Sequence, residues 1–279
     1  MQSHATTDSL FAELDALGIP PGSWAATDAD GTLWAADVAD EAWQRVLREG
    51  RLRPAGAAAV TRAAATAGVP TSGDGYADGE ALYAAYLAGD VGDPPLIEAM
   101  TACYAGWTPD EARAFADELA GELVREVYAT TPDLLRGLTA RGLRVAVVSG
   151  SPGHLVAALL RALGADPLPA VYGTGLDPEG DRLGDRLRRP ITWEEGKVEA
   201  LREALGGAPL AVAWGDSYGD LPLLEAAQAL AVLVHPRPSL LGRGREAHAA
   251  GRGRWSLLTP AHTLGGREVA PPASDRVIG

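Results

Sequence analysis

Asp28 and Asp30 stand one residue apart after a short apolar run, and a Gly-Thr turn follows them. Side chains at positions i and i+2 of an extended segment point to the same face, so we expect both carboxylates to face one site. Close carboxylates repel each other, and a divalent cation or a shared proton relieves the repulsion. One can then act as an ionised nucleophile and the other as a proton donor. The alternative is a metal-free turn, because Asp and Gly are common in turns.

Three further polar groups follow predicted strands or open predicted helices. Ser149 and Gly150 offer a hydroxyl and free N–H groups at a helix start, where anions bind. Lys197 lies in the first turn of a predicted helix, where its charge opposes the helix dipole. A nearby anion would explain this position, and an exposed lysine is the alternative. Asp216 and Asp220 follow another strand, and such hard oxygen ligands suit Mg²⁺.

Together these groups have the chemistry of phosphoryl transfer. A cation would neutralise the carboxylates and the phosphate, while Ser and Lys side chains bind the remaining phosphate oxygens. One Asp would attack phosphorus, and its neighbour would protonate the leaving oxygen. Phosphoryl transfer depends mainly on positioning and charge neutralisation, and this set supplies both.

In this order the groups resemble the four motifs of the haloacid dehalogenase-like (HAD) superfamily of phosphohydrolases. The motifs read Asp28-x-Asp30-Gly31-Thr32, Ser149, Lys197 and Gly215-Asp216-x-x-x-Asp220. The resemblance implies that Asp28 is the nucleophile, and that Asp30 is the general acid/base and gives its backbone carbonyl to Mg²⁺. It implies that Asp216 binds the metal, and that Asp220 either binds the metal or contacts a residue that does. It also implies phosphate binding by Thr32, Ser149, the Gly150 N–H and Lys197.

The second aspartate of the first motif favours a phosphatase over a dehalogenase, because a halide leaving group needs no proton. The stretch from Ala36 to about Tyr128 resembles the helical cap of the HAD branch that includes phosphoserine phosphatase. In that branch a glutamate nine residues after the nucleophile contacts the substrate amine, and here Asp37 holds that position. Asp37 can bind substrate in the same way or serve as the N-cap of a helix beginning at Val38.

Two features depart from phosphoserine phosphatases. Gly219 stands where those enzymes usually carry Asn, and the arginine that grips the substrate carboxylate does not align. Arg45, Arg48 and Arg62 are candidates for that arginine. His154 can contact substrate or simply stand at a helix start.

The aromatic residues of the insert allow a different specificity. A cage of rings would suit a quaternary ammonium such as phosphocholine, whereas ordinary packing between helices is the other interpretation. The residues are Trp34, Trp43, Tyr76, Tyr83, Tyr86, Tyr104 and Trp107.

Alternating strands and helices must position these groups, and they predict an α/β fold with a mostly parallel, Rossmann-like sheet and an inserted all-α cap domain. Predicted strands span 24–27, 143–148, 170–174, 210–214 and 231–235. We expect a hairpin around 177–180, a capping box at Thr192–Glu195, and a helix N-cap at Thr108. We expect a core of residues 1–36 and 129–279, a cap domain of residues 37–128, and a mobile tail beyond about Leu258.

Composition excludes several classes of partner. The net charge of −13 and pI of about 4.8 disfavour nucleic acid and anionic membranes, so a phosphate site must be locally positive. A single cysteine, Cys103, precludes an internal disulfide and fits a reducing cytoplasm. The first 21 residues lack the pattern of a signal peptide, and no apolar run is long enough for a membrane span.

We therefore expect Mg²⁺-dependent hydrolysis of a small phosphorylated metabolite, phosphoserine-like, through a phosphoaspartate, by a monomer or homodimer. A phosphocholine or sugar phosphatase, a phosphomutase and, less favoured, a non-catalytic binding protein are the alternatives. A serine esterase centred on Ser217 would need a later Asp-x-x-His, which is absent, and no Gly-rich loop precedes Lys197 as a P-loop requires.

Overall fold

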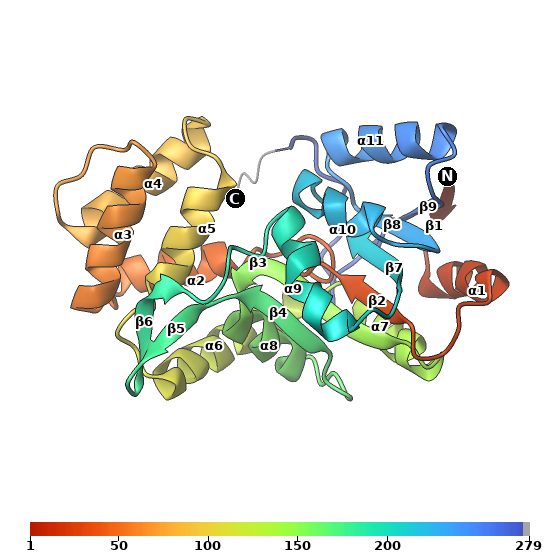
Figure 1. Cartoon of the computed structure of the whole chain (residues 1–279), viewed down its shortest axis with the longest axis horizontal. Coiled ribbons are helices and arrows are strands. Elements are labelled where there is room, and N and C mark those ends of the chain that lie inside the picture. Colours follow the sequence, from red (N-terminus) through yellow and green to blue (C-terminus); the bar gives the residue numbers. More distant parts are fainter. Residues whose placement is uncertain (276–279) are drawn as a thin grey trace.

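The computed structural model describes residues 1–275, apart from the side chain of Glu203. Its core is a seven-stranded sheet in the order β1-β9-β8-β7-β2-β3-β4, in which all neighbours pair in parallel (Figure 1). The strands are β1 (Gln2–His4), β2 (Trp24–Thr27), β3 (Arg144–Pro152), β4 (Ala170–Thr174), β7 (Leu210–Gly215), β8 (Leu230–Val234) and β9 (Trp255–Leu258). The predicted α/β, Rossmann-like fold class is confirmed.

Helices cover both faces of the sheet, which explains why β2, β7 and β8 are buried along their whole length. On one face pack α1 (Thr7–Leu17), α7 (Thr131–Ala140) and α8 (Gly153–Ala162). On the other pack α9 (Glu195–Leu205), α10 (Leu221–Glu225) and α11 (Pro238–Ala249), with the short helix η2 (Tyr218–Asp220) before α10. Successive residues of β3 serve the two faces, because Val147 belongs to the first apolar cluster and Val148 to the second.

A helical insert, residues 38–126, connects β2 to α7. It contains α2 (Val38–Arg48), α3 (Pro54–Thr66), α4 (Gly75–Ala88), α5 (Asp93–Ala102), α6 (Pro109–Leu123) and η1 (Val124–Glu126). Thr108 begins α6 as predicted: its hydroxyl accepts from Glu111 N, and the Glu111 carboxylate accepts from Thr108 N. In Figure 1, α3, α4 and α5 stand together at one side of the sheet, and α6 runs beside α8.

The predicted hairpin is formed by β5 (Leu176–Glu179) and β6 (Arg182–Leu187), which pair antiparallel outside the main sheet. It contacts the loop between α5 and α6. Leu183 N donates to Trp107 O at 2.8 Å, and Gly106 N donates to Leu183 O at 2.7 Å. The hairpin therefore binds the insert at a point that is far in sequence from the two ends of the insert.

The capping box at Thr192 is a wrong prediction. Helix α9 begins at Glu195, and its N-cap Glu194 makes no side-chain cap hydrogen bond. Thr192 is instead fully buried, and its N–H donates to the Thr174 hydroxyl at 3.2 Å. The backbone here is bent by a long-range contact, since Glu194 N donates to Gly219 O at 3.1 Å.

The composition of the tail beyond Leu258 predicted a mobile segment, and this prediction is wrong for residues 259–275. Residues 259–275 make defined hydrogen bonds, including Val269 N to Ala261 O at 2.9 Å and Ala129 N to His262 O at 2.9 Å. Pairing with a distant part of the chain fixes this Gly/Pro-rich segment. Among the described residues, no helix combines the length and apolar character needed to span a membrane.

Candidate active site

Three carboxylates meet at the carboxyl end of the central strands. Asp28 follows β2, while Asp216 and Asp220 follow its neighbour β7, whose Trp214 lies opposite Thr27. Each offers an oxygen within 4.8 Å of the others, and all three residues are buried. Residues that are far apart in sequence thus meet at the carboxyl ends of parallel strands, which is where open α/β sheets bind ligands.

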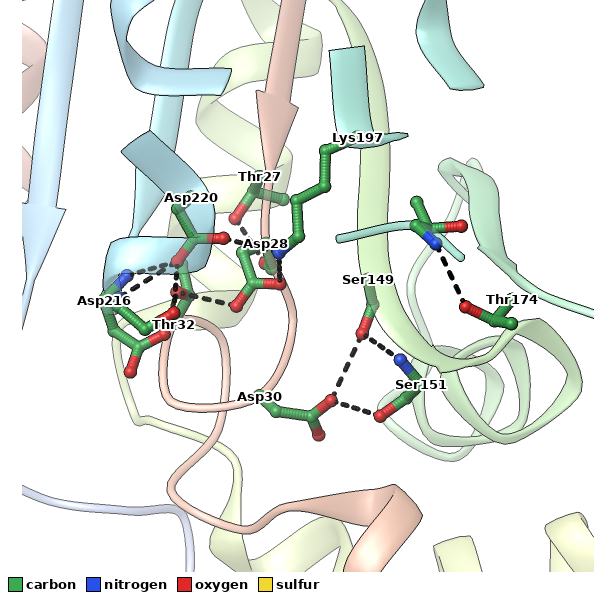
Figure 2. Close-up of polar contacts among 12 residues, drawn as sticks. Thr27, Asp28, Asp30, Thr32, Ser149, Ser151, Thr174, Lys197, Asp216 and Asp220 are labelled. Atoms are coloured by element: carbon green, nitrogen blue, oxygen red, sulfur yellow. Dashed lines mark hydrogen bonds and ion pairs between the residues drawn. The ribbon is translucent and has the colours of Figure 1, made fainter. Parts of the chain in front are cut away.

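Lys197 neutralises part of this cluster. Its side chain reaches from α9 into the core, and Nζ donates to Asp28 Oδ1 and to Asp220 Oδ1, both at 2.5 Å (Figure 2). Burial alone would lower the pKa of Lys197, but Asp220 and Asp28 outweigh burial and raise the pKa. The lysine is therefore a buried cation, which accounts for its place in the first turn of α9.

The loop after β2 fits tightly around Asp216. Gly31 has φ +78°, and a Cβ at this position would lie 2.4 Å from Asp216 Oδ2. The Thr32 hydroxyl donates to Asp28 Oδ2 at 3.2 Å and to Asp216 Oδ1 at 3.4 Å. Gly31 and Thr32 therefore allow two like-charged carboxylates to approach each other.

The carboxylate of Asp30 has different partners from that of Asp28. Its Oδ2 accepts from the hydroxyls of Ser151 at 2.6 Å and Ser149 at 3.2 Å (Figure 2). Its Oδ1 accepts from Trp34 Nε1 at 2.8 Å and Val38 N at 2.9 Å. Because β2 ends at Thr27, Asp30 lies in a loop and strand alternation does not fix its direction. Both aspartates nevertheless line one cavity.

The acidic cluster fits a divalent cation. Burial first, and then Asp220, raises the pKa of Asp28 to about 7, and the same two causes raise the pKa of Asp216 well above its usual value. Lys197 and the Arg237 guanidinium, 3.4 Å from Asp216 Oδ2, compensate only part of the charge. Three buried carboxylates form a set of hard oxygen donors, which Mg²⁺ prefers.

Ser149 and Gly150 lie near the end of β3 and line the same cavity. The Ser149 hydroxyl donates to Asp30 and accepts from Ser151 N at 3.1 Å. Helix α8 begins just beyond them, at Gly153. These groups thus lie beside the aspartates, where they can meet the oxygens of a bound phosphate.

Asp37 begins α2, as one of its two interpretations predicted, and its position at the cavity leaves the other open. It is the N-cap of α2, accepting through Oδ1 from Ala39 N at 3.0 Å and Asp40 N at 2.9 Å, and it also lines the cavity. Burial first, and then the charge of Asp30, raises the pKa of Asp37 to about 7.

The cavity encloses about 410 Å³ between the core, the helical insert and the tail. None of the three candidate arginines lines it: Arg45 pairs with Glu122, Arg62 pairs with Asp185, and Arg48 is exposed. The arginines that do line it, Arg237 and Arg267, were not singled out from the sequence. Arg237 comes shortly after β8, so its place near a strand end could have marked it as a candidate site residue. Nothing in the sequence marks Arg267.

Most aromatic residues of the insert pack between helices. Trp43, Tyr104 and Trp107 are buried, and the Tyr76 hydroxyl accepts from Leu52 N. Of the aromatic residues named above, Tyr83 and Tyr86 are the two that line the cavity. His154 does not line the cavity and packs edge-on against Tyr104.

Several known proteins are similar to this chain in sequence, and two of them are named as phosphatases. A probable phosphatase of Mycobacterium tuberculosis is 32% identical over 184 residues, which are 64% of this chain and 60% of the relative. The chain therefore spans about 60% of the length of that relative. A phosphoglycolate phosphatase of Rhodospirillum rubrum is 31% identical over 210 residues, covering 74% of this chain and 77% of the relative.

The fold is similar to that of a probable phosphoserine phosphatase of Vibrio cholerae. The TM-score is 0.54 at 16% identity, over 88% of this chain and 62% of that one. The profile of the family described as haloacid dehalogenase-like hydrolases matches residues 25–225. That span contains all four motifs, from Asp28 to Asp220, and the chain thus belongs to the haloacid dehalogenase-like hydrolase family.

Proposed function

We propose that this protein is a Mg²⁺-dependent phosphatase that hydrolyses a small phosphomonoester through a phosphoaspartate on Asp28. The observation that carries the proposal is the arrangement at the cavity floor. There Lys197 Nζ donates to Asp28 Oδ1 at 2.5 Å, and two more buried carboxylates lie beside Asp28. The Asp30 carboxylate lies outside this cluster and accepts from the Ser151 hydroxyl. The family, and the names of two relatives as phosphatases, support this assignment.

Asp28, Asp216, Asp220 and the backbone carbonyl of Asp30 would hold the ion. When bound, Mg²⁺ supplies positive charge that offsets the carboxylates and the phosphate oxygens. Lys197 contacts Oδ1 of Asp28 and the Thr32 hydroxyl contacts Oδ2, so the carboxylate is held in place for its attack on phosphorus. Ser149, the Gly150 N–H and Lys197 bind the remaining phosphate oxygens, and Thr32 positions the carboxylates.

The reaction then has two halves. Asp28 attacks phosphorus, the ester P–O bond breaks, and Asp30 gives its proton to the leaving oxygen. Asp30, now ionised, takes a proton from a water molecule that attacks the same phosphorus. The acyl phosphate bond breaks, which frees inorganic phosphate and returns Asp28 as a carboxylate. The two aspartates have separate partners, Lys197 for Asp28 and Ser151 for Asp30, so each carboxylate can be positioned for its own step.

The helical insert acts in this proposal as a cap that excludes bulk water. We place its boundaries at residues 37–128, with the core domain formed by residues 1–36 and 129–279. The cavity walls support this division, because Tyr83, Tyr86 and Met100 of the insert cover the residues at the strand ends. A covered cavity of this size favours small substrates.

A phosphoserine-like metabolite is the favoured substrate. Asp37 offers a carboxylate to an amine, and two arginines that could meet a carboxylate line the cavity while paired with other groups, Arg237 with Asp216 and Arg267 with Glu126. The phosphoglycolate phosphatase among the relatives supports a small carboxylated phosphomonoester. Phosphocholine, a sugar phosphate or a mutase reaction are the alternatives on the same core. A cytoplasmic location and a monomer or homodimer complete the proposal.

A phosphate-release assay on the purified protein tests the function. Phosphoserine, phosphoglycolate, phosphocholine and glucose 6-phosphate are compared with Mg²⁺ and with EDTA, and Asp28→Asn serves as the control. We expect Mg²⁺-dependent release, strongest with phosphoserine and absent in the variant. Release that persists in Asp28→Asn would refute the phosphoaspartate, and no release from any substrate would refute the phosphatase.

A further inference from the structure

The C-terminal segment, residues 259–275, binds to the connection between the helical insert and the core. Leu264 N donates to Val127 O at 2.7 Å, and Gly265 N donates to Arg125 O at 2.8 Å. In the other direction Ala129 N donates to His262 O at 2.9 Å. The guanidinium of Arg267 adds two hydrogen bonds to the Glu126 carboxylate, at 2.9 and 2.7 Å. The segment is therefore fixed to the second junction of the insert.

That junction is also paired with the first one. Ala35 N donates to Glu126 O at 2.9 Å, and Tyr128 N donates to Leu33 O at 3.0 Å. Three stretches that are distant in sequence thus lie side by side, with residues 124–129 between the loop after β2 and the C-terminal segment. The segment is thus connected, through residues 124–129, to the loop that carries Asp28.

A second anchor holds the other end of the segment. Arg237 Nη1 donates to Asp275 O at 2.9 Å, and Ser239 N donates to Asp275 Oδ1 at 2.8 Å. The same Arg237 contacts Asp216 through Nε. The residues between the two anchors must therefore run along the cavity, and Val269, Ala270 and Pro272 are among its lining residues.

The lining residues of this stretch differ in kind from those of the core. The core supplies charged and hydroxyl groups at the cavity floor, whereas Val269, Ala270 and Pro272 supply apolar surface with no polar side-chain atom. Such side chains discriminate between ligands by shape and not by charge. Since the floor must hold the phosphate, the leaving group must meet the remaining wall, which these three residues share with Leu96, Ile97 and Met100 of the insert.

We propose that the C-terminal segment is the specificity wall of the active site, where Val269, Ala270 and Pro272 limit the size of the leaving group. This inference rests on the proposed function, because it takes the cavity to be the substrate site. It assigns a role in recognition to residues that lie outside the span matched by the family profile.

Binding of alkylphosphonates tests the wall without requiring turnover. Methylphosphonate and n-butylphosphonate carry the same charged group, cannot be hydrolysed at their P–C bond, and differ only in the chain that would meet the wall. Their Kd values are measured by calorimetry with Mg²⁺ on the full chain. The informative quantity is the ratio of the butyl to the methyl Kd.

Ala270→Trp is the test variant, and Ala261→Trp is its matched control. Both alanines are exposed on the same segment, but only Ala270 lines the cavity. We expect Ala270→Trp to raise the Kd ratio about tenfold, on the scale of small apolar differences in a pocket. The ratio should stay within about twofold in Ala261→Trp. Val269→Ala enlarges the cavity, so it should lower the ratio and provides a second test if the Trp variant folds poorly.

The outcomes separate the two proposals. If both phosphonates bind the wild type, and the ratio is unchanged in Ala270→Trp and in Val269→Ala, the wall is refuted while the phosphate site stands. An equal rise in Ala261→Trp would also refute it. If neither phosphonate binds the wild type in Mg²⁺, the phosphate site of the proposed function fails, and the wall fails with it.

Discussion

The Asp30 carboxylate accepts a hydrogen bond from the Ser151 hydroxyl at 2.6 Å, in surroundings distinct from those of Asp28. Asp28 lies against the Lys197 ammonium and two more carboxylates, whereas Asp30 is surrounded by neutral donors. The two carboxylates are thus oriented by different groups, and substitution of a partner of one need not disturb the other. Ser151 is then a positioning residue for Asp30.

Ser151→Ala should lower kcat about tenfold or more with little change in KM, because a misdirected acid weakens the chemical step more than binding. Steady-state kinetics with Mg²⁺ measure both quantities. Ser151→Thr retains the hydroxyl and is the matched control, which we expect to keep most of kcat. Equal losses in the two variants would mean that Ser151 matters for packing and not for its hydrogen bond.

Asp28 should make the metal-free protein less stable as pH rises. Burial and Asp220 raise the pKa of Asp28 to about 7 in the folded state, above its ordinary value of 3.8. Below about pH 4 the group is protonated in both states, and between pH 4 and 7 only the unfolded state readily ionises it. The contribution to folding stability is therefore present at low pH and is lost as pH rises through about 7.

Urea denaturation in EDTA, at several pH values from 4.5 to 8, checks this sign (each pKa unit corresponds to about 1.4 kcal/mol). Asp28→Asn lacks the titrating group, so its free energy of unfolding should improve relative to the wild type as pH rises. Carboxylates distant from Asp28 titrate in both proteins and cancel in the difference, whereas Asp216 also loses the repulsion of Asp28, which changes the difference in the same direction. A difference that does not vary with pH would contradict the raised pKa.

Mg²⁺ should stabilise the folded protein through the acidic cluster. An ion that binds only the native state raises Tm as the ion concentration rises. The rise in Tm should be greater at pH 8 than at pH 5, because the carboxylates of the cluster are more fully ionised at pH 8. Asp216→Asn should weaken this response at least about tenfold in Mg²⁺ concentration. The surface variant Asp15→Asn is the control, and an undiminished response in Asp216→Asn would place the ion elsewhere.

The positions of Asp28, Asp216 and Ser149 could be predicted because parallel strands end at one edge of a sheet, so local strand patterns determine which loops meet. The environment of Asp30 could not, since it depends on Ser151 and Trp34 beyond the strand. Thr192 shows the limit of local motifs: its capping-box pattern gives way to the contact between Glu194 and Gly219. Composition likewise gave no sign that the tail pairs with Val127, because that pairing joins segments far apart in sequence.

Asp37 has two roles that two substitutions can separate. Asn is as good an N-cap as Asp, so Asp37→Asn should keep the start of α2 intact while removing the charge that faces the cavity. Asp37→Ala removes both, and should lower the free energy of unfolding by about 1 kcal/mol. If the carboxylate binds an amine, both variants should raise KM for phosphoserine similarly while leaving KM for phosphoglycolate nearly unchanged. Asp37→Asn with the KM of the wild type for phosphoserine would show that Asp37 only begins the helix.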